Sequence, residues 1–375
     1  MNHLVTVSHS YVIAGNRRLA HEMAMQGRGR WEVTALAPAR LSGDLREVAL
    51  EPIAHEACTT HALQIRLGRS AHLRRYERRL RTLLAGRWDV VHIWEEPYVA
   101  ACAQVAAAAP AGSRVVPATF QNIVKNYPPP LSLFERCVMG RAAGWIAFGE
   151  TVHEAHAAKP LYAARPSRVI SPGVDVNRFR PDPAVRAALR TRLGWTDDVP
   201  VVGFLGRFVP EKGLHVLMRA LEHARQPWRA LVVGGGPMVA DLSTFAAAHP
   251  GRVTVLTGVG HDEVPEYLSV MDLLCAPSQT TGRWREQFGR MLIEAMACGV
   301  PVVASRSGEI PHVVSDTGLL VDEADVARWT EAIDRLLGDP DLRRDLAVRG
   351  LARAHEKYAW PVVARAHLAF FEELL

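Results

Sequence analysis

Along this chain, short apolar runs alternate with longer stretches in which apolar residues recur at a helical period. The apolar runs are rich in valine and leucine, and each ends at glycine, proline, serine or another polar residue. This alternation predicts parallel strands with helices on both faces of a sheet. The predicted strands are HLVTVS, WEVTALA, DVVHIW, RVVPATF and GWIAFG in the first half, and PVVGFLG, RALVVGGG, VTVLTG, DLLCAPS and PVVAS in the second.

The pattern occurs twice in 375 residues, which predicts an α/β fold of two doubly wound, Rossmann-like domains. Proline and glycine cluster in ISPGVDVNRFRPDPA, so we place the N-terminal domain at 1–172 and the C-terminal domain at 173–359. The last helical segment, 360–375, is a candidate for packing back onto the first domain. Ligands of such sheets bind at the carboxyl ends of the strands, so we expect the site in the cleft between the domains.

Composition is that of a globular protein, with 49% hydrophobic and 22% charged residues. The five cysteines are scattered and form no C-x-x-C pair, which favours free thiols over disulfides or a zinc site. The N-terminus has the pattern of a strand rather than of a signal peptide, and no apolar run reaches the roughly 18 residues that a membrane span needs. We expect a cytoplasmic protein, and keep open a peripheral association with the inner membrane face.

Charge is distributed unevenly, although the net charge is only +5. Residues 1–180 carry 23 Lys and Arg against 14 Asp and Glu, and the remainder carries 21 against 25. Seven arginines lie in 66–84. This segment fits a solvated helix face, or contact with an anionic membrane or an acidic acceptor. Nucleic acid is disfavoured, because no binding motif is present and Tyr76 is the segment's one aromatic residue.

A pair of cations follows a predicted strand in GFLGRFVPEKG. Arg207 and Lys212 would both lie in the strand-to-helix loop, where two cations can clamp a diphosphate. The spacing is not that of a Walker loop, and surface cations on a structural loop remain the alternative. The glycines of RALVVGGGPM permit close backbone approach but lack the full dinucleotide fingerprint.

Two glutamates eight positions apart flank a predicted helix start in WREQFGRMLIEAMACGVPVV. Free amides near Phe288 and Gly289 would favour a phosphate there. Glu286 would precede the helix and Glu294 would lie a little over one turn inside it. Carboxylates bind sugar hydroxyls, so the arrangement fits a nucleotide-sugar, with Glu294 on the ribose and Glu286 on the transferred sugar. A solvated Glu286 with a salt-bridged Glu294 fits the spacing about as well.

Several segments, in the expected order, resemble the signatures of glycosyltransferase family 4. They are DVVHIWEEPY, TFQNIVKNYPPP, SPGVD, GRFVPEKG, PSQTTGRWREQFGRMLIEAMACGVPVVAS and SGEIPHVV. The resemblance spans nearly the whole chain, and the glutamate pair is its strongest motif. It implies a GT-B fold and a retaining, metal-independent transfer of sugar from a nucleotide donor.

The resemblance also implies roles for individual residues. Arg207 and Lys212 resemble the family's diphosphate clamp, Glu294 the ribose-binding acid, and Glu286 the acid at the donor sugar. Gly15 resembles a glycine that lies near the phosphates and acceptor in a first loop. The predicted donor contacts are completed by Phe288, Gly289, Gln287, Gly206, Gly235 and Val259.

Two departures from the family pattern bear on mechanism. Gly15 is followed by Asn16 where a second glycine is common, and Gln121 stands where many relatives have a histidine. Glutamine can bind a sugar hydroxyl but cannot take its proton at neutral pH. This fits a reaction in which the leaving phosphate accepts the proton on the same face of the sugar. Glu95 and Glu96 follow a strand end, and fit either the acceptor side or a structural loop.

These observations predict a retaining hexosyltransferase that acts on a hydroxyl of a small-molecule, lipid-linked or saccharide acceptor. The alternatives are a GT-B-fold nucleotide-sugar epimerase and a non-catalytic nucleotide-sugar-binding protein. We expect a UDP-sugar rather than a GDP-sugar as donor, no resident cofactor or metal, and no nucleic-acid partner.

Overall fold

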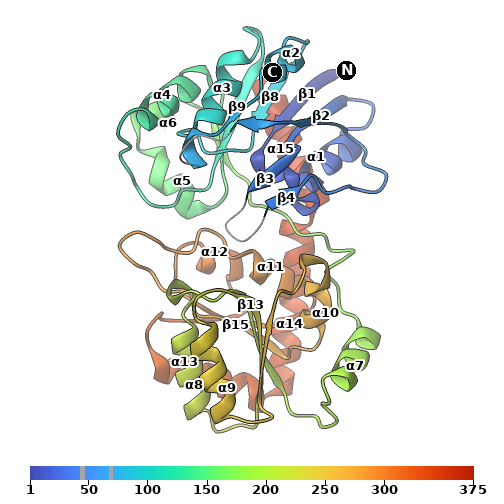
Figure 1. Ribbon diagram of the computed structural model, residues 1–375, viewed down its shortest axis with the longest axis vertical. Helices are drawn as coiled ribbons and strands as arrows, with labels where there is room; N and C mark the ends of the chain where they lie inside the picture. Colours follow the sequence, from blue (N-terminus) through green and yellow to red (C-terminus); the bar gives the residue numbers. More distant parts are fainter. Residues whose placement is uncertain (43–46, 67–70) are drawn as a thin grey trace. The chain divides into compact units, whose positions relative to one another are not determined.

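The computed structural model describes residues 1–42, 47–66 and 71–375, and divides into two compact units. Unit 1 comprises residues 1–173 with 360–375, and unit 2 comprises residues 174–359. Each unit has a parallel sheet of its own with helices around it (Figure 1). The predicted α/β fold class is therefore confirmed.

The main sheet of unit 1 has, among its described residues, seven parallel strands in the order β11-β10-β9-β8-β1-β2-β5. They are β1 (Asn2–Val7), β2 (Trp31–Pro38), β5 (Thr59–Leu63), β8 (Val90–Ile93), β9 (Arg114–Thr119), β10 (Trp145–Ala147) and β11 (Ser167–Val169). Two short antiparallel pairs lie beside it: β3 (Arg40–Ser42) with β4 (Glu47–Ala49), and β6 (Ile65–Arg66) with β7 (Arg75–Tyr76).

The helices of unit 1 include one from the far end of the chain. The α-helices are α1 (Ala14–Gln26), α2 (Arg79–Leu84), α3 (Ala100–Ala108), α4 (Leu131–Arg141), α5 (Glu150–Ala157), α6 (Pro160–Ala163) and α15 (Trp360–Leu374), and the 3-10 turns are η1 (His9–Val12) and η2 (Ala71–Leu73). Helix α15 buries Trp360, Val363, Leu368 and Phe371 in the same core as Leu19 of α1. With Ala364, which is also buried in this core, these positions recur every three or four residues, so one face of α15 is apolar along its length. Because this face packs into the core, residues 360–375 belong to unit 1 (Figure 1).

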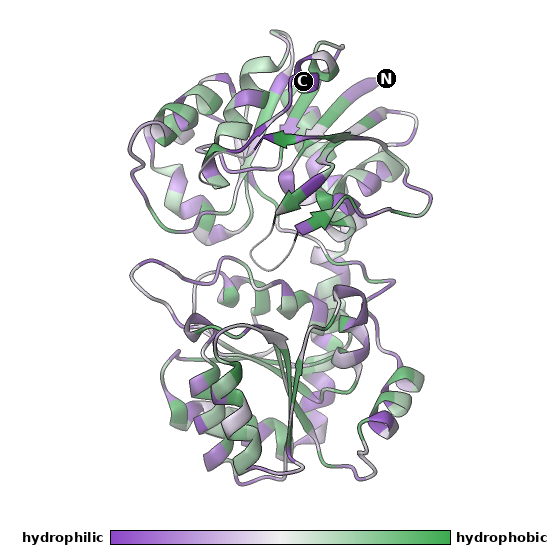
Figure 2. Cartoon of the chain, in the orientation of Figure 1, coloured by the Kyte–Doolittle hydropathy of each residue, from purple (hydrophilic) through white to green (hydrophobic). Residues whose placement is uncertain are grey.

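The sheet of unit 2 has six parallel strands in the order β14-β13-β12-β15-β16-β17. They are β12 (Val201–Arg207), β13 (Arg229–Gly235), β14 (Val253–Thr257), β15 (Leu273–Ala276), β16 (Val302–Ser305) and β17 (Leu319–Val321). Figure 2 shows hydrophobic residues concentrated along the central strands. Both faces of these strands are buried, which explains their nearly continuous apolar sequences.

Helices cover both faces of this second sheet. They are α7 (Pro183–Arg192), α8 (Leu214–His223), α9 (Val239–Ala248), α10 (Val264–Ser269), α11 (Arg290–Ala297), α12 (Ile310–Val314), α13 (Val326–Gly338) and α14 (Pro340–Arg353), with the shorter turns η3 (Pro210–Lys212), η4 (His261–Glu263) and η5 (Ala354–Tyr358). One core lies beneath α8, α9 and α13, and the other beneath α10, α11 and α12.

Several local predictions are corrected by the structure. Gly15 lies in the first turn of α1 rather than in a loop, and Arg207 is the last residue of β12. Segment 66–84 is not one helix, because β7 and a 3-10 turn precede the short α2; its residues 67–70 lie outside the described part of the chain. In the described residues, no helix combines the length and apolar character required to cross a bilayer.

Candidate functional site

The C-terminal-half residues singled out from the sequence gather at one edge of the sheet of unit 2. Strands β12, β13 and β15 are parallel, so their carboxyl ends share an edge. Arg207 and Gly235 end β12 and β13, and Lys212 ends the turn η3 that follows. The segment after β15 carries Glu286 and leads into α11, which holds Glu294. This edge is the donor-side candidate site.

Glu286 is buried and paired with Lys212. Its Oε2 accepts hydrogen bonds from Nζ of Lys212 and, at 2.9 Å, from Oγ of Ser278. The side chains of Lys212 and Glu286 are only 13% and 8% exposed, so the pair is much less screened by solvent than a surface ion pair. Nζ of Lys212 also lies 5.3 Å from the ring centre of Trp284. Neither Ser278 nor Trp284 was predicted to take part.

The main chain of Glu286 is held by the segment SGEIP. The amide of Glu309 donates to the carbonyl of Glu286 at 3.0 Å. Gly308 has φ +51°, and a Cβ at this position would lie 2.0 Å from the carbonyl oxygen of Glu286. A side chain at 308 is therefore excluded by both backbone conformation and space. The main chain of SGEIP thus supports Glu286, and the acid of the motif, Glu309, is 3% exposed.

Helix α11 begins after Gly289, close to the buried pair. Gly289 is the N-cap residue and has no side chain to cap the first turn, which contains no acid. The first amides of a helix carry partial positive charge and favour an anion. Phe288, which precedes them, is 6% exposed and packs edge-on against Tyr358 at 5.8 Å. Its side chain belongs to the core, so only its main chain is placed to contact a ligand.

Glu294 lies deeper in α11 and is 6% exposed. Burial raises the pKa of its carboxyl, although Arg290 and Arg178 act in the opposite direction. Nε2 of His261 lies 4.0 Å from Oε1, and burial lowers the pKa of this imidazole to about 4. The contact with His261 is beyond hydrogen-bond distance, but the charges of Arg290 and Arg178 also act on Glu294, so a salt-bridged Glu294 stays an alternative to the ribose contact. A carboxylate in this setting gains stability from hydroxyl donors.

The remaining predicted donor contacts lie at the same edge but make fewer interactions. Arg207 is exposed and forms no ion pair with another described residue. Gly206 pairs in register with Gly234, and a Cβ at Gly235 would meet nothing within 4 Å. Val259 and Gln287 are half-buried.

The residues singled out in unit 1 lie in a different chemical setting. Gln121 follows β9, is 8% exposed, and accepts a hydrogen bond from the amide of Ile123 at 3.1 Å. The two residues before Gln121 are bonded to Glu96, which accepts hydrogen bonds from Oγ1 of Thr119 at 2.7 Å and from the amide of Phe120 at 2.9 Å. Burial raises the pKa of Glu96 to about 7. Glu96 therefore holds the segment that leads into Gln121.

Glu95, its neighbour, holds the turn after β1. Its carboxylate lies 3.0 Å from Nδ1 of His9 and accepts a hydrogen bond from the amide of the same residue. The ring of His9 stacks on Tyr76, with 5.0 Å between ring centres. Both glutamates of WEEPY thus have structural partners, which the sequence alone left undecided.

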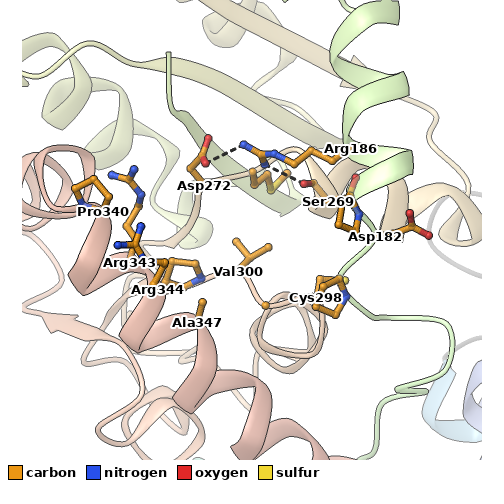
Figure 3. A pocket seen from close by; sticks show the side chains of 15 residues that line it. Asp182, Arg186, Ser269, Asp272, Cys298, Val300, Pro340, Arg343, Arg344 and Ala347 are labelled. Atoms are coloured by element: carbon orange, nitrogen blue, oxygen red, sulfur yellow. Dashed lines mark hydrogen bonds and ion pairs between the residues drawn. The ribbon is translucent and has the colours of Figure 1, made fainter. Parts of the chain in front are cut away.

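A cavity of about 350 Å³ lies at the opposite edge of the second sheet, close to the residues that precede β15 and β16 (Figure 3). There Arg186 donates to Oδ1 of Asp272 at 2.9 Å and to the carbonyl of Ser269 at 3.0 Å. Arg343 donates to carbonyls at the end of α13. Arg186 and Arg343 are thus engaged in hydrogen bonds within the protein. None of the predicted site residues lines this cavity. No group of three or more metal-ligating side chains was found among the described residues.

Comparison with known proteins identifies similar chains. The profile of the family described as Glycosyl transferases group 1 matches residues 185–352. A GDP-mannose-dependent alpha-(1-6)-phosphatidylinositol monomannoside mannosyltransferase of Mycobacterium tuberculosis is 34% identical over 311 residues, 78% of either chain. Its namesake from Mycolicibacterium smegmatis is 40% identical over 200 residues, and this match spans about half of each chain, 51% and 52%.

Among solved structures, Anabaena HepE in complex with UDP-glucose matches with a TM-score of 0.73 at 20% identity, covering 100% of both chains. Likeness at this identity concerns the fold. Such neighbours are GT-B glycosyltransferases, so the predicted GT-B fold is confirmed.

Proposed function

Because this chain belongs to the group 1 glycosyltransferases, also called glycosyltransferase family 4, we propose that it moves a hexose from a nucleoside-diphosphate sugar to an acceptor hydroxyl. The observation that carries the proposal is the arrangement at the edge of unit 2. A buried Lys212–Glu286 pair, the uncapped start of α11 and the buried Glu294 occur there together. Each matches one part of a nucleotide-sugar: sugar, diphosphate and ribose.

The diphosphate would bind at the start of α11, where the helix dipole and free amides favour it. Lys212 spends one of its three ammonium donors on Glu286, which leaves two for phosphate oxygens. Arg207, exposed at the end of β12, would supply the second cation that stabilises the leaving nucleotide. Glu294 would accept from the ribose hydroxyls, and Glu286 from those of the transferred sugar.

We propose that the reaction retains anomeric configuration. The bond between C1 of the sugar and the diphosphate oxygen breaks, and the acceptor oxygen bonds to C1 on the same face. The acceptor proton passes to the leaving phosphate, because Gln121 cannot accept it at neutral pH. Positive potential from Arg207, Lys212 and the helix start would take the place of a metal ion, and no resident cofactor is required.

The donor base and the acceptor belong to the proposal as well. The name of the M. tuberculosis relative favours GDP-mannose and a phosphoinositide acceptor. HepE, whose complex holds UDP-glucose, is similar in fold alone, so a UDP donor rests on the expectation from the sequence. A lipid acceptor would fit peripheral contact between the arginine-rich segment 66–84 and an anionic membrane.

A panel of UDP-, GDP-, ADP- and TDP-sugars tests the proposal. A ligand that binds the native state raises the melting temperature, so the sugar nucleotide with the preferred base should raise it most. The selected donor is then incubated with candidate acceptors, with and without excess chelator, and the anomeric configuration of the product is determined by NMR. Donor binding without transfer to any acceptor would favour a non-catalytic binding protein. A changed sugar without transfer would favour an epimerase, and a magnesium-reversible loss in chelator would refute metal independence.

A further inference from the structure

Four arginines line a cavity of about 570 Å³ in unit 1, and none of its lining residues is among those assigned above to transfer. The lining residues are Arg66, Leu73, Arg75, Tyr76, Arg78, Arg81 and Gln104. No carboxylate is among them. We name this the arginine cavity.

The local fold forces these four cations together. Arg66 and Arg75 are register partners in the antiparallel pair β6–β7, so their side chains leave the same face about 5 Å apart at Cβ. Arg78 and Arg81 are three residues apart at the start of α2, so they also share a face. Like charges in either arrangement repel and destabilise the protein, unless an anion lies between them.

The neighbouring polar groups do not neutralise these charges. None of the four arginines forms an ion pair with another residue in the described part of the chain. The nearest acid in sequence, Glu77, instead accepts the amide of Gln64 at 2.9 Å. The side-chain amide of Gln104 accepts from the backbone N–H of Tyr76 at 2.8 Å and donates to the carbonyl of the same residue at 2.9 Å. The cavity therefore offers, from four exposed arginines, hydrogen-bond donors with positive charge.

We infer that the arginine cavity binds a phosphate-bearing group. One guanidinium group can donate two parallel hydrogen bonds to two oxygens of the same phosphate. Four such groups around one cavity carry more positive charge than a single carboxylate would balance. The volume lies within the roughly 300–1,000 Å³ range of small-molecule sites. The phosphate belongs either to a soluble phosphate ester or to a lipid headgroup, since both present the same oxygens. Binding here is independent of sugar transfer.

Inorganic phosphate is the first probe, added at constant ionic strength against chloride, with the melting temperature as readout. The variant Arg66→Gln/Arg75→Gln should need at least about tenfold more phosphate for the same stabilisation. Its control, Arg28→Gln/Arg87→Gln, removes two exposed charges of unit 1 outside the cavity and should behave as the parent. In a Lys212→Ala background, which removes phosphate binding at the donor site from the readout, the tenfold difference between the cavity variant and its control should persist. Should the first variant melt abnormally in chloride, Arg78→Gln/Arg81→Gln replaces it.

Vesicle flotation then distinguishes the two sources. Binding to phosphatidylglycerol but not phosphatidylcholine vesicles, lost in the cavity variant and kept in the control, identifies a lipid phosphate. A phosphate response without vesicle binding identifies a soluble ester. The inference is overturned if phosphate stabilises the parent no more than chloride does, or if the cavity variant responds as its control does.

Discussion

The carboxyl edges of the two sheets are built from different kinds of interaction. In unit 2, a buried ion pair joins Lys212 to Glu286, and the main chain of Glu286 is held by Glu309 beside a glycine that admits no side chain. In unit 1, Glu96 is held by a hydroxyl and an amide, and burial brings its pKa to about 7. The first edge therefore carries fixed charge, whereas the charge of the second changes near neutral pH.

This difference indicates a division of tasks. A fixed cation beside a helix start suits a diphosphate, whose negative charge grows as the nucleotide leaves. An edge whose acids are held by hydroxyl and amide donors and by His9 suits a neutral hydroxyl, which is recognised by geometry rather than by charge. Four sets of substitutions test the comparison, in order of decreasing expected effect.

Removing the cations of unit 2 should have the largest effect. We expect Arg207→Ala and Lys212→Ala each to lower turnover by at least about 10²-fold, the usual cost of losing a group that stabilises developing charge. Steady-state transfer kinetics on folded protein measure this. The control Arg306→Ala removes an exposed cation from the same unit and should be near normal. Near-normal turnover in both site variants would contradict the proposed clamp.

The two glutamates should separate binding from turnover. Glu294→Gln should weaken both nucleoside diphosphate and intact donor by roughly ten- to a hundredfold, the value of about 1.5–3 kcal/mol for a hydrogen bond to a charged group. Glu286→Gln should leave nucleoside diphosphate affinity nearly unchanged and lower turnover. Calorimetric titration of both variants, beside kinetics, decides this. Equal weakening of diphosphate binding would make both acids supports of the helix start instead.

Gly308→Ala tests the backbone support of Glu286. Alanine at a positive φ costs about 1–2 kcal/mol in the free energy of unfolding, before any clash with the carbonyl of Glu286 is counted. The melting temperature and the turnover of the variant should both fall. Gly282→Ala is the matched control in the neighbouring loop, where a Cβ meets nothing within 4 Å. Equal behaviour of the two variants would show that the close approach is not needed.

Glu96→Gln should have the smallest effect and the clearest dependence on pH. Because folding raises the pKa of Glu96 from 4.5 to about 7, its contribution to stability is complete below pH 4.5 and is lost as pH rises through 7. Glutamine can accept from the amide of Phe120, and its NH2, like the OH of a protonated acid, can donate to Oγ1 of Thr119 once that hydroxyl turns from donor to acceptor, so stability at pH 4.5 should change by less than about 1 kcal/mol. Melting temperatures across pH 4.5–8 should fall less steeply for the variant. Parallel curves would refute the shifted pKa.

The sequence predicted the parts of the fold that depend on local pattern. Apolar runs located ten of the strands in the two main sheets, but β5, β11 and β17 were missed because TTHAL, SRV and LLV are short or polar. At the site, the positions of Glu286 and Glu294 around a helix start were predicted correctly. The partnership of Lys212 with Glu286 was not, because it joins residues 74 apart. The shifted pKa of Glu96 likewise arises from three-dimensional burial, which spacing does not encode.

Helix α15 affects the order in which this protein can assemble during synthesis. Its residues leave the ribosome after those of unit 2, yet they share a core with Leu4 and Leu19. Unit 2, from Val174 to Ala359, is continuous in the chain and can close its own core as soon as it has emerged. Unit 1 must wait, with an apolar face of α1 exposed, until residues more than 330 positions downstream arrive. The N-terminal half is thus translated first but finished last, and it has the longer exposure to chaperones and proteases.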